Sequence, residues 1–121
     1  MTLSILMSRA GGQRSVGVLR LNGEVDIATS ETLRQHLAAL RDDGYQNVVL
    51  DLSGVTFCDS TGLGTVATHA KRLMESGGKL VVAGLRPDVS AVFDISGLSQ
   101  AIPIAESVPK AVALAGEDGP S

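Results

Sequence analysis

The spacing of hydrophobic residues changes twice along the first part of the chain. Two short runs rich in β-branched and aliphatic residues, Leu3–Ser8 and Val16–Leu21, flank the glycine-containing sequence AGGQR. This arrangement predicts a β-hairpin. Leucines at positions 33, 37 and 40 then recur at helical spacing, Thr29 or Ser30 can cap the segment, and Gly44 can end it. The next element is therefore predicted to be a helix.

A nearly continuous apolar run, Asn47–Leu52, follows and has the length of a strand. Runs of this kind are typical of strands that are covered on both faces. The segment after it carries an apolar stripe at i, i+3, i+4 and i+7, which predicts a second helix ending at Gly77-Gly78. The stripe consists of Leu63, Val66, Ala67, Ala70, Leu73 and Met74.

The last third of the chain alternates short strand and helix patterns. The segment Lys79–Ala83 predicts a strand, Pro87–Ser96 a short helix closed by Gly97, and Ala101–Ala105 a last short strand. Ser107 can cap a final helix with a proline in its first turn. The residues expected to face inward are Val89, Val92 and Phe93 on the third helix, and Val112 and Ala113 on the last.

The order β-β-α-β-α-β-α-β-α predicts one small α/β domain over residues 1–121. Helix crossovers favour parallel pairing from the third strand onward, so we expect a mixed, mostly parallel sheet with an N-terminal hairpin and about four helices. Residues 115–121 are expected to form a disordered tail. The hydrophobic content of 44% allows a real core, and the aromatic content of only 2% means that Val, Leu, Ile and Ala must build it.

The composition excludes several classes of function. Ten basic and thirteen acidic residues give a net charge of −3, and no run of Lys or Arg supplies a basic footprint for nucleic acid. No stretch approaches the roughly 18 apolar residues of a membrane span, and no signal peptide is recognisable. The single cysteine, Cys58, allows no internal disulfide and no metal-ligand spacing. The sequence predicts a cytoplasmic protein without nucleic-acid or membrane contact, cofactor or metal ion.

The sequence FCDSTGLGTV, residues 57–66, joins the central strand to the second helix. Either Asp59 or Ser60 can cap this helix. Gly62 and Gly64 fall in its first turns, where each costs about 1 kcal/mol relative to alanine. We therefore expect something to approach the backbone closely here. The amides and positive dipole of a helix start favour an anion, so a hydroxyl at this point is a good phosphoryl acceptor.

The motif DSTGLG, preceded by GEVDIATSETLRQHL and followed by FDISGL, resembles the STAS domains of bacterial anti-sigma-factor antagonists over nearly the whole chain. The resemblance implies partner switching, in which the unphosphorylated antagonist binds an anti-sigma factor serine kinase and frees the sigma factor. Phosphorylation of the serine after the motif aspartate, here Ser60, implies release, and a PP2C-type phosphatase resets the protein. Such a chain is a substrate and a binding module, not an enzyme.

The resemblance also implies a partner-binding surface around the acceptor serine. Asp26 matches the aspartate of the family's GE-[LIV]-D motif, and Thr29 and Ser30 follow it closely. In this interpretation the two aspartates shape the surface and its charge, the glycines let the kinase approach, and Thr61 holds the turn and could be a secondary acceptor. The expected partner-binding residues are Asp26, Thr29, Asp59, Thr61, Gly62, Leu63 and Gly64.

Two other functions stay open. The first is a constitutive STAS-type subunit of a larger stress or lipid-transport assembly, in which Ser60 is never modified. The second is a nucleotide-binding enzyme that uses the same helix start, because residues 62–67 match the fingerprint G-x-G-x-x-[GA]. That fingerprint needs its first glycine directly after a strand and an acid on the next strand. Neither condition is met here.

For four further residues a chemical role can be weighed against a purely structural one. Asp51 resembles the phosphoacceptor of a receiver domain, but the first strand ends without the carboxylates that Mg²⁺ would need. We expect it at a strand end, bonded to amides of the following turn. His36 and His69 are expected on the polar sides of their helices. Cys58 is expected to be a small buried hydrophobe.

Overall fold

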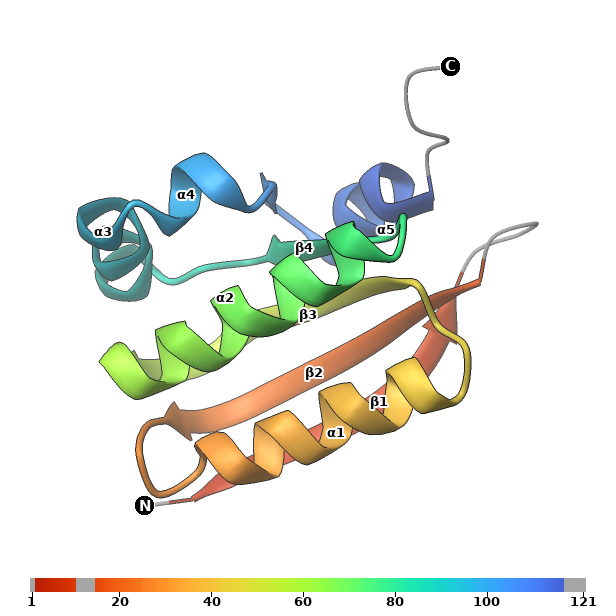
Figure 1. Ribbon diagram of the computed structural model, residues 1–121. Coiled ribbons are helices and arrows are strands. Elements are labelled where there is room, and N and C mark those ends of the chain that lie inside the picture. Colours follow the sequence, from red (N-terminus) through yellow and green to blue (C-terminus); the bar gives the residue numbers. More distant parts are fainter. Residues whose placement is uncertain (1, 11–14, 117–121) are drawn as a thin grey trace.

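The computed structural model describes residues 2–10 and 15–116, which form one five-stranded sheet with helices on both faces (Figure 1). Strand order follows the sequence: the first two strands pair antiparallel as a hairpin, and all later pairs are parallel. This confirms the mixed, mostly parallel sheet. In chain order the elements are β1 Leu3–Ala10, β2 Val16–Val25, α1 Ser30–Asp42, β3 Asn47–Cys58, α2 Ser60–Glu75, β4 Lys79–Ala83, α3 Pro87–Ser96, α4 Leu98–Ala101, β5 Ile104–Ala105 and α5 Val108–Gly116.

Two cores, one on each face of the sheet, hold these layers together. The larger core lies under α1, α2 and α3, and contains Leu50 of the central strand and Phe93 of α3. The smaller one lies under α5, where Val49 and Val81 of the sheet meet Ala111 and Ala115. Because β3 contributes to both, its first six residues are all buried, as a strand covered on both faces requires.

The central strand is longer than its sequence pattern predicts. It runs for 12 residues, to Cys58, whereas the apolar run that predicted it ends at Leu52. At Gly54 an added Cβ would lie 1.9 Å from the Asn22 side-chain oxygen, so the missing side chain makes room for a neighbouring strand. β2 extends correspondingly to Val25 and shifts register twice along this stretch. The extension carries both strands to the start of α2.

The structure corrects the C-terminal third in three respects. The short helix α4, Leu98–Ala101, is absent from the predicted order, and it shortens the last strand to Ile104–Ala105. On α5 the buried residues are Ala111 and Ala115, whereas Ala113 is exposed and Val112 is half-buried. The helix also continues through Gly116, so the expected tail cannot begin at 115. Residues 117–121 lie outside the described part of the chain.

The buried face of α2 includes a histidine that the sequence placed on the polar side. His69 is 4% exposed, whereas Met74, expected in the apolar stripe, is exposed. His69 follows Val66 and precedes Leu73 at helical spacing, and both of these face the main core. Its counterpart His36 is half-buried on α1. None of the described helices is long and apolar enough to cross a membrane.

The buried histidine should make stability depend on pH. Burial, and then the charges of Arg72, Arg41 and Arg34, lower the pKa of His69 from its ordinary 6.5. The unfolded chain therefore binds this proton more readily, and the free energy of unfolding should decrease as the pH falls below about 6.5. Urea unfolding between about pH 5 and pH 8 measures this decrease. It should be smaller in His69→Gln and unchanged in the control His36→Gln; equal decreases in both variants would contradict the prediction.

Candidate functional site

The site is built where β2 and β3 end and α2 begins. Ser60 is the first residue of α2 and is exposed. Asp59 before it is the N-cap, because its Oδ1 accepts a hydrogen bond from the Gly62 amide at 2.9 Å. This resolves the choice between the two capping candidates. A cap of this kind satisfies a first-turn amide and places a negative charge at the positive end of the helix dipole.

Asp59 also ties the start of α2 to two distant segments. Its Oδ2 accepts a hydrogen bond from the amide of Ile27, 32 residues earlier in the chain, at 3.0 Å. Its own amide donates to the Val25 carbonyl, also at 3.0 Å. Both carboxylate oxygens and the amide are therefore engaged in fixing the position of Ser60. The hydrogen bonds of Asp59 therefore hold the loop between β2 and α1 against the first turn of α2.

The loop between β2 and α1 is held by Asp26 from inside. Asp26 Oδ1 accepts hydrogen bonds from the amides of Ala28 and Thr29 at 2.9 and 3.0 Å, and its carbonyl accepts from Ser30 Oγ at 2.6 Å. The Thr29 hydroxyl donates to the Glu24 carbonyl at 2.7 Å. Asp26 is 4% and Thr29 7% exposed. These side chains determine the shape of the loop and are not themselves on the surface.

The two glycines of the motif, Gly62 and Gly64, differ in the space around them. At Gly62 an added Cβ would lie 2.7 Å from both the carbonyl oxygen and a methyl carbon of Val25, so this glycine permits close packing of α2 on β2. Gly64 is exposed, and its Cβ would meet nothing within 4 Å. Leu63 between them is buried in the main core. The space above Gly62 is thus filled by the protein itself, which also argues against a pyrophosphate there.

The exposed residues around Ser60 include two hydrophobic ones that the sequence analysis did not select. Thr61 and Gly64 of α2 are exposed, as expected for a binding surface. Ile27, at the tip of the loop, is 77% exposed, and Phe57 near the end of β3 is also exposed. Ile27 had one available signal, because it is an apolar residue within the polar sequence DIATS. Single exposed apolar side chains are common on protein surfaces, so these two add apolar area to the region without by themselves defining a binding surface.

A family model described as the STAS domain matches residues 9–111, which is most of the chain. The chain belongs to the STAS domain family. The match includes the whole site, from the loop that carries Asp26 to the first turns of α2. The resemblance found in the sequence is thereby confirmed.

Named relatives of this STAS chain point to one kind of regulator. It is 42% identical over 93 residues to BtrV of Bordetella bronchiseptica, provisionally named an anti-sigma factor antagonist, covering 77% of this chain and 80% of that protein. It is 35% identical over 92 residues to the anti-sigma F factor antagonist of Paenibacillus polymyxa, covering 75% and 79%. The crystal structure of an anti-sigma factor antagonist from Mycobacterium paratuberculosis superposes with a TM-score of 0.80 at 25% identity, covering 94% and 96%.

The cysteine of this STAS domain lies directly beneath the site. Cys58 is buried, and burial followed by the charge of Asp59 raises the pKa of its thiol to about 11. At neutral pH the thiol is therefore protonated, and it is a poor nucleophile. The prediction that Cys58 acts as a small buried hydrophobe is confirmed.

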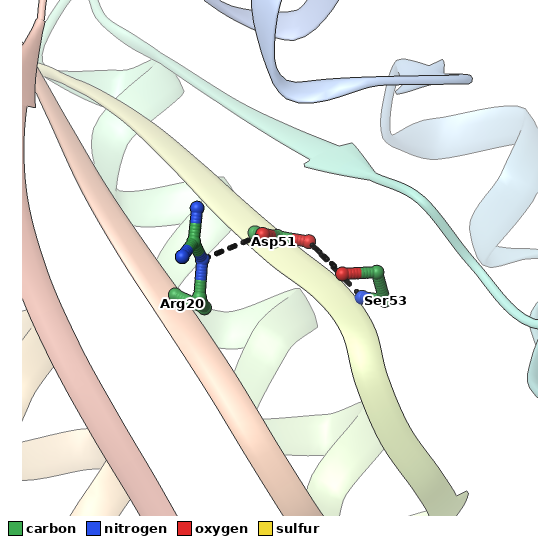
Figure 2. Close-up of polar contacts among 3 residues, drawn as sticks. All are labelled: Arg20, Asp51 and Ser53. Atoms are coloured by element: carbon green, nitrogen blue, oxygen red, sulfur yellow. Dashed lines mark hydrogen bonds and ion pairs between the residues drawn. The ribbon is translucent and has the colours of Figure 1, made fainter.

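Asp51 of the STAS domain is part of a separate polar cluster on the sheet (Figure 2). Its Oδ1 accepts from the amide and hydroxyl of Ser53 at 3.0 and 2.8 Å, and its Oδ2 accepts from Arg20 Nε at 3.2 Å. The bond to a following amide was expected, but its position at a strand end is wrong, because β3 continues past it. Within residues 2–10 and 15–116, no three His, Cys, Asp or Glu side chains are grouped to hold a metal ion.

Proposed function

We propose that this chain is an anti-sigma factor antagonist that is switched off by phosphorylation of Ser60. Unphosphorylated, it binds an anti-sigma factor kinase in the cytoplasm, and this binding releases the sigma factor. The observation that carries the proposal is the position of Ser60, exposed on the first turn of a helix whose start is fixed by both oxygens of Asp59. The names of the relatives at 42% and 35% identity support the same regulatory class.

The site is suited to accepting a phosphoryl group. No hydrogen bond from elsewhere in the described part of the chain occupies the Ser60 hydroxyl. In the reaction, Ser60 Oγ forms a bond to the γ-phosphorus of ATP, the bond to ADP breaks, and the hydroxyl proton leaves. The product carries about −1.5 to −2 charges at pH 7, which first-turn amides and the helix dipole accommodate. A partner surface that packed against a neutral hydroxyl must then accept this charge next to Asp59.

The residues expected at the partner surface divide into two groups. Those that can touch a partner are Ser60, Thr61, Gly64, Ile27 and Phe57, which are exposed. Those that are buried or engaged in internal hydrogen bonds, and therefore position the surface, are Asp26, Thr29, Asp59, Gly62 and Leu63. On this proposal the chain catalyses no reaction itself. It is a substrate of the kinase and of a PP2C-type phosphatase.

The proposal is tested by the intact mass of the protein after incubation with ATP and the anti-sigma kinases of the same organism. We expect one added phosphate with the cognate kinase, no addition to Ser60→Ala, and unchanged addition to the control Ser8→Ala, which removes an exposed hydroxyl on β1. A PP2C-type phosphatase should remove the group. If no kinase adds phosphate while a stable complex still forms, the chain is a constitutive binding subunit and the switch is refuted.

A further inference from the structure

The helices α1 and α2 run side by side over the sheet (Figure 1), and a hollow of about 290 Å³ opens between them. Its walls carry the hydroxyl residues Thr61, Thr65 and Thr68 of α2, together with Arg34, His69 and Arg72. Gly64 completes the lining. We call this hollow the α1–α2 groove. It starts at Thr61, the residue next to Ser60, and is therefore continuous with the proposed phosphorylation site.

The charge of the groove is positive, in contrast to the net charge of −3 for the chain. Arg34 lies on α1 and Arg72 on α2, so the two helices contribute one guanidinium each. Arg34 pairs with Glu31 one turn earlier on the exposed surface. Both partners are exposed to solvent, where ion pairs add little to stability, so a competing carboxylate can displace Glu31. Within the described residues, Arg72 forms no ion pair with a carboxylate.

The pKa of the buried His69 also indicates that positive charges gather at the groove. The pKa of His69 is lowered first by burial and then by Arg72, Arg41 and Arg34, which means that three guanidiniums act on one imidazole. A neutral imidazole avoids a fourth positive charge between the helices. Among the described residues, Glu31 is the only carboxylate that forms an ion pair with one of these three arginines.

The groove is also open at its end near Ser60. A side chain at position 64 would meet nothing within 4 Å, so the glycine there leaves the backbone of α2 accessible. A partner that covers Ser60 must also extend over Thr61 and Gly64, which line the groove. Side chains of the partner that extend past Gly64 along the groove face Arg34 and Arg72. Arginine binds carboxylates with two parallel hydrogen bonds, which makes a carboxylate the matching group.

We propose that the α1–α2 groove binds an acidic segment of the protein partner that covers Ser60. This inference rests on the proposed function for the existence of such a partner, and it adds the chemistry by which the partner is oriented. The groove guides an acidic surface toward Ser60 against the overall negative charge of the chain. Such local complementarity mainly increases the association rate and sets the orientation of the complex.

The first test uses a ligand of this chemistry and no kinase. An oligoglutamate peptide is titrated into the ¹⁵N-labelled protein at low salt. We expect amide shifts at Thr61, Gly64, Thr65 and Thr68, which disappear at about 1 M salt because the Debye length then falls to about 3 Å. Arg72→Glu should abolish the shifts. Shifts that are absent, or that lie elsewhere on the surface, overturn the proposal.

The matched control is Lys71→Glu, which makes the same charge change one position earlier on α2. Lys71 is exposed and does not line the groove. It should leave the peptide-induced shifts in place. Equal losses in Lys71→Glu and Arg72→Glu would show that only the net charge matters, and would overturn the groove as a binding site.

The second test uses the kinase identified by phosphate addition. Arg72→Glu should weaken the complex by about tenfold, chiefly by slowing association, and Lys71→Glu by less than about twofold. If both variants bind like the wild type while Ser60 is still phosphorylated, the groove proposal fails and the proposed function stands. If no kinase acts on Ser60 but oligoglutamate binds in the groove, the switch fails and the groove stands as a site for acidic segments.

Discussion

Ser60→Asp is expected to weaken the complex with the anti-sigma partner by about tenfold or more, since like charges brought together at an interface cost several kcal/mol. The new carboxylate would lie beside Asp59, at a surface that the partner covers. The fold should be unaffected, because an acidic residue in the first turn of a helix is favourable. Isothermal titration calorimetry with the kinase that adds phosphate in the mass experiment, together with thermal unfolding of each variant, separates loss of binding from loss of structure.

Ser60→Asn is the matched control, because asparagine has nearly the size of aspartate and no charge. We expect it to bind much more tightly than Ser60→Asp, and Ser60→Ala to bind like the wild type. Equal weakening by Asn and Asp would mean that size and not charge releases the partner. Binding of Ser60→Asp at wild-type affinity would refute the electrostatic switch.

Gly62→Ala and Gly64→Ala are expected to change stability in opposite directions. At position 62 the added methyl group must displace the Val25 backbone or α2 itself, since both Val25 contacts would be at 2.7 Å. Overpacking of this kind typically costs about 1–3 kcal/mol. At position 64 there is no obstacle, and replacing glycine by alanine inside a helix gains about 1 kcal/mol.

Urea unfolding of the two variants measures this difference directly. The midpoint should decrease for Gly62→Ala and increase for Gly64→Ala, with similar slopes if both remain two-state. Two stabilised variants would show that α2 is not packed closely on β2. Two destabilised variants would show that position 64 is constrained by something other than the space around it.

The sequence predicted best those elements whose signals are local. The bounds of β4 and α3 agree with the structure, because a glycine pair precedes β4, and α3 has a proline at its start and ends at Gly97 in the left-handed conformation with φ of 83°. The second half of β3 was missed because the continuous apolar run ends at Leu52, and Gly54 lies beyond it. Its fit against Asn22 depends on the pairing of two strands, which spacing along one segment cannot indicate.

The difference between local signals and contacts between distant segments also explains which features of the site could be predicted. Asp59 and Ser60 were predicted to start α2 because a cap and a helix start occupy adjacent positions in the sequence. The burial of Asp26, Thr29 and Leu63, and the exposure of Ile27, follow from how the loop between β2 and α1 meets α2. The hydrogen bond from Ile27 to Asp59 joins residues 32 positions apart. His69 was misplaced although its spacing puts it on the same helix face as Val66 and Leu73, because its polar ring was taken to favour the solvent side.

The double engagement of Asp59 has a kinetic consequence for the proposed switch. Because the start of α2 is fixed to Val25 and Ile27 before any modification, phosphorylation changes the charge of a surface whose backbone is already in place. No refolding or domain movement has to precede release. On the proposed function, the time taken to change state then depends on the kinase, the phosphatase and the binding and dissociation of the partner, with no folding step added to them.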